Sequence, residues 1–255
     1  MKINKEFSPE NYNFKLAMKQ NIEKQLVPVL NNYEFVKFGA NKYAREVEGI
    51  LQIISFRIEN DRLKAFATYY PIFVPYDNLL NYGVELTGTT GSYLLNGKYF
   101  TTISNFNITP KNQIKNYYQK ILPSFDKLLQ GILEGVLPEM EQVNSLSKFI
   151  NKFEYQQVEF FGHNFDIQLK ELPVHQYIFQ VYACLHGSFS DSVQKLDNIK
   201  RITLESEIQD VIQKLLFTEK NTLTREQFIL NLTEIVNARR KKYKLKVKSN
   251  KFIDM

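Results

Sequence analysis

The chain is 255 residues long, with 44% apolar and 24% charged residues, which predicts an ordinary soluble globular protein of one large domain or two small ones. Its single cysteine, Cys184, excludes an intramolecular disulfide and a cysteine-based metal site, and it fits a reducing compartment. The polar N-terminal residues lack a signal-peptide core and no apolar run is long enough to cross a bilayer, so we expect a cytoplasmic protein without a membrane-spanning segment.

The net charge of +6 is concentrated near the end of the chain. Residues 239–251 hold eight basic residues and no acidic one, whereas the rest of the chain has 25 basic and 27 acidic residues. A uniformly basic nucleic-acid surface is therefore not indicated. The basic run is either a nucleic-acid site or a solvated helix end, because cations near a helix C-terminus interact favourably with the helix dipole.

The first predicted helix begins at Ser8-Pro9, since serine is a good N-cap and proline fits the first helical position. Pro28 is expected to kink or end this helix. Its apolar side is formed by Leu16, Ile22, Leu26 and Val29.

Four strands are predicted next. Within 50–58, Ile54 and Phe56 lie on a strongly apolar face, whereas Ser55 and Arg57 lie on a mixed face, because side chains alternate across a strand. Polar turns separate the strands and make neighbours antiparallel. The predicted strands are 34–38, 42–47, 50–58 and 63–74.

Residues 93–101 form the clearest predicted hairpin, since Asn96-Gly97 supplies the two positive φ values of a type I′ turn. A long helix is predicted from Thr109-Pro110, with an apolar stripe that recurs every three or four residues as far as Ile132 and a bend at Pro123. This helix and the first one are expected to cover the apolar face of the sheet.

The second half of the chain is predicted to be helical. Helices are expected at 139–152, at 174–185, around 204–215 and from Thr224 into the basic run, while 155–169 is either a strand pair or a loop. The predicted fold class is α+β: an antiparallel β-sheet meander covered by an N-terminal helix and a long following helix, then an all-helical C-terminal half. Residues 1–135 are assigned to a sheet domain and 136–255 to a helical region, or the two form one continuous domain.

The first part of the chain resembles a bacterial family of domains of unknown function, the one numbered four-three-zero-four. The resemblance covers residues 14–103. It rests on Leu26-Val27-Pro28-Val29-Leu30, Glu34-Phe35, Tyr43-Ala44-Arg45 and the apolar strand 50–56 with Gln52. Glu34 stands where that family usually has glycine. The resemblance implies no established activity and no catalytic residue.

The side chains that could carry catalysis are few. His163, His175 and His186 show no metal-ligand spacing, and we expect neither a metal nor a cofactor. Cys184 with a histidine could form a nucleophile–base pair, but its apolar neighbours favour an inert core thiol.

Exposed aromatic and basic side chains are the expected binding residues, because such side chains commonly dominate interface energy. On the sheet these are Arg45, Arg57 and Tyr70. Arg45 either anchors an anionic ligand or partner or pairs with a glutamate such as Glu34 or Glu46. In the tail they are Arg239, Arg240, Lys241 and Lys242.

Three functions remain open from the sequence. The first is a non-catalytic protein-interaction protein of immunity or accessory type that uses the sheet and binds another protein. The second is a nucleic-acid-associated protein that uses the basic tail. The third is a hydrolase whose site the sequence does not reveal.

Overall fold

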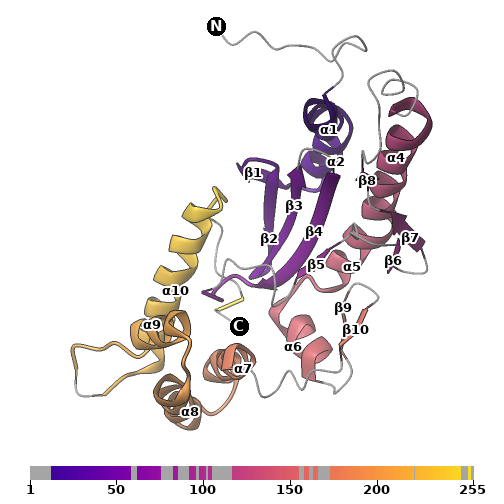
Figure 1. The fold of residues 1–255 in the computed structure, drawn as a ribbon. Helices are drawn as coiled ribbons and strands as arrows, with labels where there is room; N and C mark the ends of the chain where they lie inside the picture. The colour runs from indigo at the N-terminus through magenta and orange to yellow at the C-terminus, as the bar shows by residue number, and fades with distance from the viewer. Residues whose placement is uncertain are drawn as a thin grey trace, which may run out of the picture.

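The structure is a computed structural model that describes residues 13–58, 62–75, 83–85, 92–95, 98–101, 103–104, 117–154, 158–160, 163–165, 173–220, 222–247 and 252–253. It has an α+β fold (Figure 1). The predicted starts of two helices, Ser8-Pro9 and Thr109-Pro110, and the Asn96-Gly97 turn lie outside the described residues.

The main sheet is an antiparallel meander with the strand order β1-β2-β3-β4-β5, and β8 also pairs with β4. This confirms the predicted meander. Its strands are β1 (Val36–Gly39), β2 (Lys42–Val47), β3 (Ile50–Ile58), β4 (Arg62–Pro71), β5 (Gly83–Glu85) and β8 (Ile103–Ser104). Two hairpins stand apart from it: β6 (Ser92–Leu95) with β7 (Lys98–Thr101), and β9 (Val158–Phe160) with β10 (His163–Phe165).

The turn between β2 and β3 fixes the register of the sheet. Glu48 and Gly49 have φ values of 43° and 82°, which are the two positive values of a type I′ turn. Val47 therefore pairs with Ile50 and Arg45 pairs with Gln52. Gly49 has a second constraint, because a Cβ built there would meet the Phe252 ring at 2.7 Å.

Helices occupy much of the rest of the described chain. The first helical segment is α1 (Phe14–Asn21), η2 (Ile22–Leu26) and α2 (Val27–Asn32); the second is η5 (Tyr117–Ile121), α4 (Leu122–Gly131), η6 (Ile132–Val136) and α5 (Leu137–Gln142). The remaining helices are α6 (Leu146–Glu154), α7 (Pro173–His186), α8 (Phe189–Ile202), α9 (Ser206–Leu215) and α10 (Arg225–Lys242). Helix α8 was not predicted, and the predicted helix 139–152 is interrupted between α5 and α6.

Three π-helical turns, η2, η5 and η6, each end two residues before a proline: Pro28, Pro123 and Pro138. A proline inside an α-helix cannot donate a backbone hydrogen bond, and its ring collides with the carbonyl four residues earlier. The π-helical turn before the proline has a different backbone hydrogen bond: the Val27 N–H bonds to the Ile22 carbonyl, five residues back. The first helical segment consequently continues past Pro28 to Asn32 instead of ending there.

Helices cover both faces of the sheet. On the face that carries Gln52 and Tyr69, these two side chains contact Met140 of α5 and Phe149 of α6. The opposite face carries Tyr70, whose hydroxyl lies 3.2 Å from that of Tyr243, directly after α10. Figure 1 shows α7 to α10 grouped together at one end of the sheet, with α10 beside β1 and β2.

The buried apolar residues form one cluster that extends from Phe14 to Ile253. Ile54 and Phe56 belong to it, with exposed fractions of 0% and 4%, which confirms their predicted burial. Contacts in this cluster therefore join residues 1–135 with residues 136–255. The division of the chain into two domains at this point stays a prediction. None of the helices in the described ranges has the length and apolar character needed to span a membrane.

Two helices end in the same hydrogen-bonded motif with a non-glycine residue in the left-handed conformation. At the end of α2, Glu34 has a φ of 62°, and its N–H and that of Phe35 bond to the carbonyls of Asn31 and Leu30. At the end of α10, Lys244 has a φ of 57° in the equivalent position. This is the Schellman arrangement, in which glycine is the favoured left-handed residue.

We therefore predict that Glu34→Gly raises the free energy of unfolding by about 0.5–1 kcal/mol, because glycine adopts positive φ without a Cβ penalty. Chemical denaturation of the purified proteins measures the change. Glu34→Ala is the control: it also removes the carboxylate but keeps the Cβ, so it should not stabilise. Equal stabilisation by both substitutions would contradict the backbone explanation.

Candidate functional site

Arg45 lies at the centre of a buried polar network on the face of the sheet beneath α5. Its Nε donates to Gln52 Oε1 at 2.7 Å, and its two terminal nitrogens donate to the Tyr33 carbonyl at 3.1 Å and to Glu141 at 2.5 Å. Gln52 donates in turn to the Met140 carbonyl at 2.7 Å. Arg45 thus satisfies a carbonyl at the end of α2 and also joins the sheet to α5.

An ion pair with a glutamate was one of the two alternatives predicted for Arg45, with Glu34 and Glu46 as the suggested partners. The pair forms with Glu141 of α5 instead of Glu34 or Glu46. The guanidinium also lies 5.7 Å and 4.9 Å from the ring centroids of Tyr33 and Phe35. Arg45 is only 6% exposed, so its planar cation is surrounded by contacts within the chain.

Glu46, the next residue of β2, points to the other face of the sheet and pairs with Arg240 of α10. The Arg240 Nε and one terminal nitrogen each donate to a different Glu46 oxygen at 2.7 Å, in a two-pronged ion pair. Both side chains are almost fully buried. A buried pair of this kind stays favourable only while both charges are present, since either one alone would have no compensation for lost solvation.

Arg239 and Tyr243 complete the contact of α10 with the sheet. Arg239 donates to the Pro75 carbonyl and to the Tyr243 hydroxyl, both at 3.3 Å. Burial raises the pKa of the Tyr70 hydroxyl, which faces that of Tyr243. Phe38 of β1 stacks edge-to-face on the Tyr243 ring at 4.9 Å between centroids.

The predicted binding residues thus fall into two groups. Arg45, Tyr70, Arg239 and Arg240 are buried, with exposed fractions of 8% or less, and contact residues of the same chain. Arg57, Lys241 and Lys242 are exposed. The expectation that Arg45 and Tyr70 are exposed was wrong, because α5 covers one face of the sheet and the end of α10 covers the other. Partner binding by the predicted residues stays a prediction.

The basic run begins in a helix and ends outside it. As predicted, the last helix continues into the basic run, as far as Lys242, and residues 243–247 then form a turn and an irregular segment. Tyr243, Phe252 and Ile253 are buried in the core cluster. The exposed basic side chains of the described tail are Lys241, Lys242, Lys244 and Lys246.

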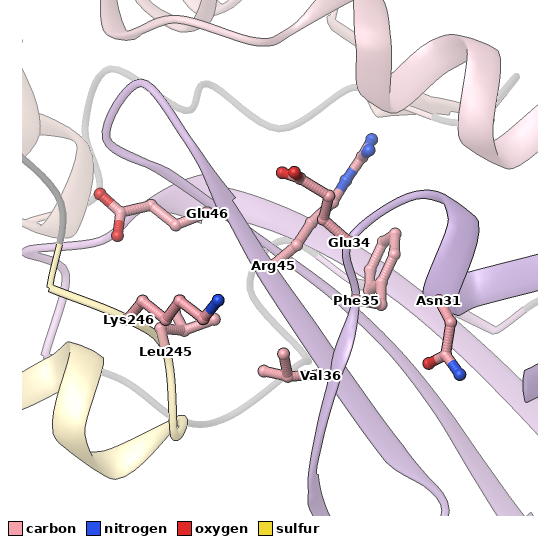
Figure 2. Close-up of a pocket in the computed structure, with 8 residues that line it drawn as sticks. All are labelled: Asn31, Glu34, Phe35, Val36, Arg45, Glu46, Leu245 and Lys246. Carbon is pink, nitrogen blue, oxygen red and sulfur yellow. The ribbon is translucent and has the colours of Figure 1, made fainter.

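A recess with a volume of about 310 Å³ lies where the tail approaches the open side of β2 (Figure 2). We call it the edge recess. Its lining comes from the end of α2 and the residues after it, from β2, and from the residues after α10: Asn31, Glu34, Phe35, Val36, Arg45, Glu46, Leu245 and Lys246. Figure 2 shows the Lys246 amino group pointing into the space between the tail and β2. The recess therefore brings Arg45 and the basic tail, two separately predicted sites, into one place.

A stretch of the β2 backbone also borders the recess. Because Arg45 and Val47 belong to hydrogen-bonded pairs with β3, the N–H and C=O of the intervening Glu46 point to the opposite edge. Strand β1 pairs with β2 only from Val36 and Ala44 onward, since the left-handed Glu34 turns the preceding chain away. Among the described strands, none pairs with β2 beside Glu46.

The residues considered for catalysis are not gathered at this recess. Cys184 is fully buried in α7, and burial raises the pKa of its thiol to about 12, which suits an inert core thiol. His175 is also buried in α7, His186 is exposed at its end, and the His163 side chain lies outside the described atoms. Within the part of the chain that the structure describes, no three histidine, cysteine or acidic side chains are placed to hold a metal ion.

Removing one partner of the Glu46–Arg240 pair should be strongly destabilising. We predict that Arg240→Met lowers the free energy of unfolding by about 3–5 kcal/mol, because Glu46 is left charged and buried. Adding Glu46→Leu should recover much of the loss. Urea titration measures both variants.

Lys241→Met is the matched control for this pair. Lys241 is exposed beside Arg240, so its loss should change stability by less than about 0.5 kcal/mol. A similar loss for both methionine variants, or no recovery in the double variant, would contradict the assigned role of the pair.

The change of stability with pH should also depend on His175. Burial lowers its pKa from 6.5 to about 4, so the unfolded chain holds more protons between these values and the free energy of unfolding falls as pH drops through this range. Between about pH 7.5 and about pH 5 the fall attributable to His175 is roughly 2 kcal/mol. Denaturant titrations at both pH values should show that His175→Gln reduces the fall more than His186→Gln does, because His186 is exposed, although partial burial and Arg225 also lower its pKa.

A scan against protein-family models, a search of curated proteins and a search of solved structures each find no match to the chain. The resemblance of residues 14–103 to the bacterial domain family therefore stays a prediction.

Proposed function

We propose that the chain is a non-catalytic, cytoplasmic protein-interaction protein of immunity or accessory type, whose partner binds at the edge recess. The observation that carries this proposal is the convergence of β2 and the basic tail on one recess with the Lys246 amino group directed into it. Apolar walls are provided by Phe35, Val36 and Leu245. A mostly apolar recess into which a lysine is directed suits recognition of a side chain from a partner.

The occupant we propose is an extended segment of the partner that carries an acidic side chain. The Glu46 backbone at the open edge of β2 offers one donor and one acceptor to an added strand, which is the usual basis of strand addition. Lys246 would pair with the acidic side chain. An apolar side chain of the same segment would then contact Val36 and Leu245.

Nucleic-acid association is the second candidate function. Lys241, Lys242, Lys244 and Lys246 are exposed at and beyond the end of α10, and this favours contact with phosphates. Arg239 and Arg240, which were expected to take part, are engaged in the packing of α10. The hydrolase alternative gains no support from the described residues, whose buried Cys184 and His175 lie within the core.

Membership of the bacterial domain family also stays a proposal, and the backbone at Glu34 supports it. The family usually has glycine at this position, and a φ of 62° is a conformation that favours glycine. The sequence departure at Glu34 is therefore compatible with a conserved backbone shape.

The test is photo-cross-linking in the native cells with benzoylphenylalanine in place of Asn31, an exposed residue of the recess wall. We expect one discrete protein to be captured. Adding Lys246→Glu should lower the yield about tenfold or more, because a like charge opposite an acidic side chain is repulsive. The matched control is Lys127→Glu on α4, an exposed lysine outside the recess, which should leave the yield unchanged.

Absence of a cross-linked protein, or equal loss of yield in both charge-reversed variants, would overturn the proposal. A product that disappears on nuclease treatment would favour the nucleic-acid candidate instead.

A further inference from the structure

A second recess lies between α9 and α10, with a volume of about 470 Å³. The end of α9 lies beside the start of α10, because Asn231 near the start of α10 donates to the carbonyls of Leu215 and Phe217, at 3.0 Å and 2.8 Å. The recess is lined by residues of both helices. We call it the helix groove.

The floor of the helix groove is apolar. Val211 comes from α9, and Ile235 and Ala238 come from α10. Leu230, which is 59% exposed, lies two helical turns before Ala238 on the same side of α10, with Glu234 between them, and adds exposed apolar surface beside the recess.

The walls of the helix groove carry acidic side chains. Glu207 and Asp210 on α9 and Glu234 on α10 are exposed, and none forms an ion pair with another described residue. Lys214 is the exposed cation of the lining, while Arg239 is buried and bonded to Pro75 and Tyr243. This acidic surface belongs to a chain with a net charge of +6, so it is a local feature.

We propose that the helix groove binds a basic amphipathic helix of a partner protein, at a place separate from the edge recess. Two helices offer no free backbone edge for a strand, but a groove between them can receive the apolar stripe of a third helix. Lysine or arginine side chains on both sides of that stripe would face Asp210 on one wall and Glu234 on the other. The span from Glu207 to Lys214 is about 10 Å, so two to three turns of the partner helix fill it.

The test uses a phage-displayed library of random peptides about 16 residues long, long enough for a helix of four turns. It is selected on the full chain. We expect enriched peptides with apolar residues at helical spacing flanked by lysine or arginine. Fluorescence anisotropy of the enriched peptide then gives its affinity for each variant. Asp210→Lys should weaken binding about tenfold or more through charge repulsion. Ala238→Trp should do the same by filling the groove without a change of charge.

Asp126→Lys on α4 is the matched control, since it reverses one exposed aspartate outside the groove and should change the affinity less than about twofold. Thermal denaturation checks that every variant folds. The proposal is overturned by a selection that enriches no peptide, by enriched peptides that are acidic or lack helical spacing, or by equal weakening in the Asp126 variant. Concentration-dependent self-association that Ala238→Trp abolishes would assign the groove to a second copy of the chain and would equally overturn it.

Discussion

Two adjacent residues of one strand, Arg45 and Glu46, hold the layers of this structure together. Because neighbouring side chains of a strand point to opposite faces, Arg45 reaches Glu141 of α5 and Glu46 reaches Arg240 of α10. The Glu46–Arg240 pair is almost fully buried and the Arg45–Glu141 pair is partly buried. In both pairs a charge is therefore favourable only while the opposite charge is present. These pairs therefore fix the positions of both helical layers relative to β2. They also position β2 and the segment after α10, which line the edge recess.

The central strands were predictable because their information is local. Both β2 and β3 have the predicted bounds, since alternation and turn residues are read within a few positions. Strand β1 begins two residues later than predicted, because Glu34 and Phe35 complete the end of α2. Pro28 was expected to disturb its helix, and the disturbance is a π-helical turn that precedes the proline.

The candidate site was only partly predictable because its contacts join residues far apart in the sequence. Arg45 was singled out as an unusual strand residue, but its partner Glu141 is 96 residues away. Arg239 and Arg240 belong to a run whose composition is that of a solvated helix end, and nothing nearby signals that Glu46 requires a cation. Helix α8 was missed because Ser192, Leu196 and Ile199 are its buried residues, too few for a strong apolar period. The helix groove depends on how α9 and α10 pack, which no single segment encodes.

The separation of 194 residues between Glu46 and Arg240 has a consequence for folding during synthesis. The ribosome releases the sheet long before it releases α10, so the face that carries Tyr70 and Ile53 has no cover from that helix in the growing chain. Contacts of such long range are also slow to form, because a large loop must close first. The newly made sheet therefore presents an apolar surface for a substantial part of translation, a state in which chaperone binding and aggregation compete with the arrival of the last helix.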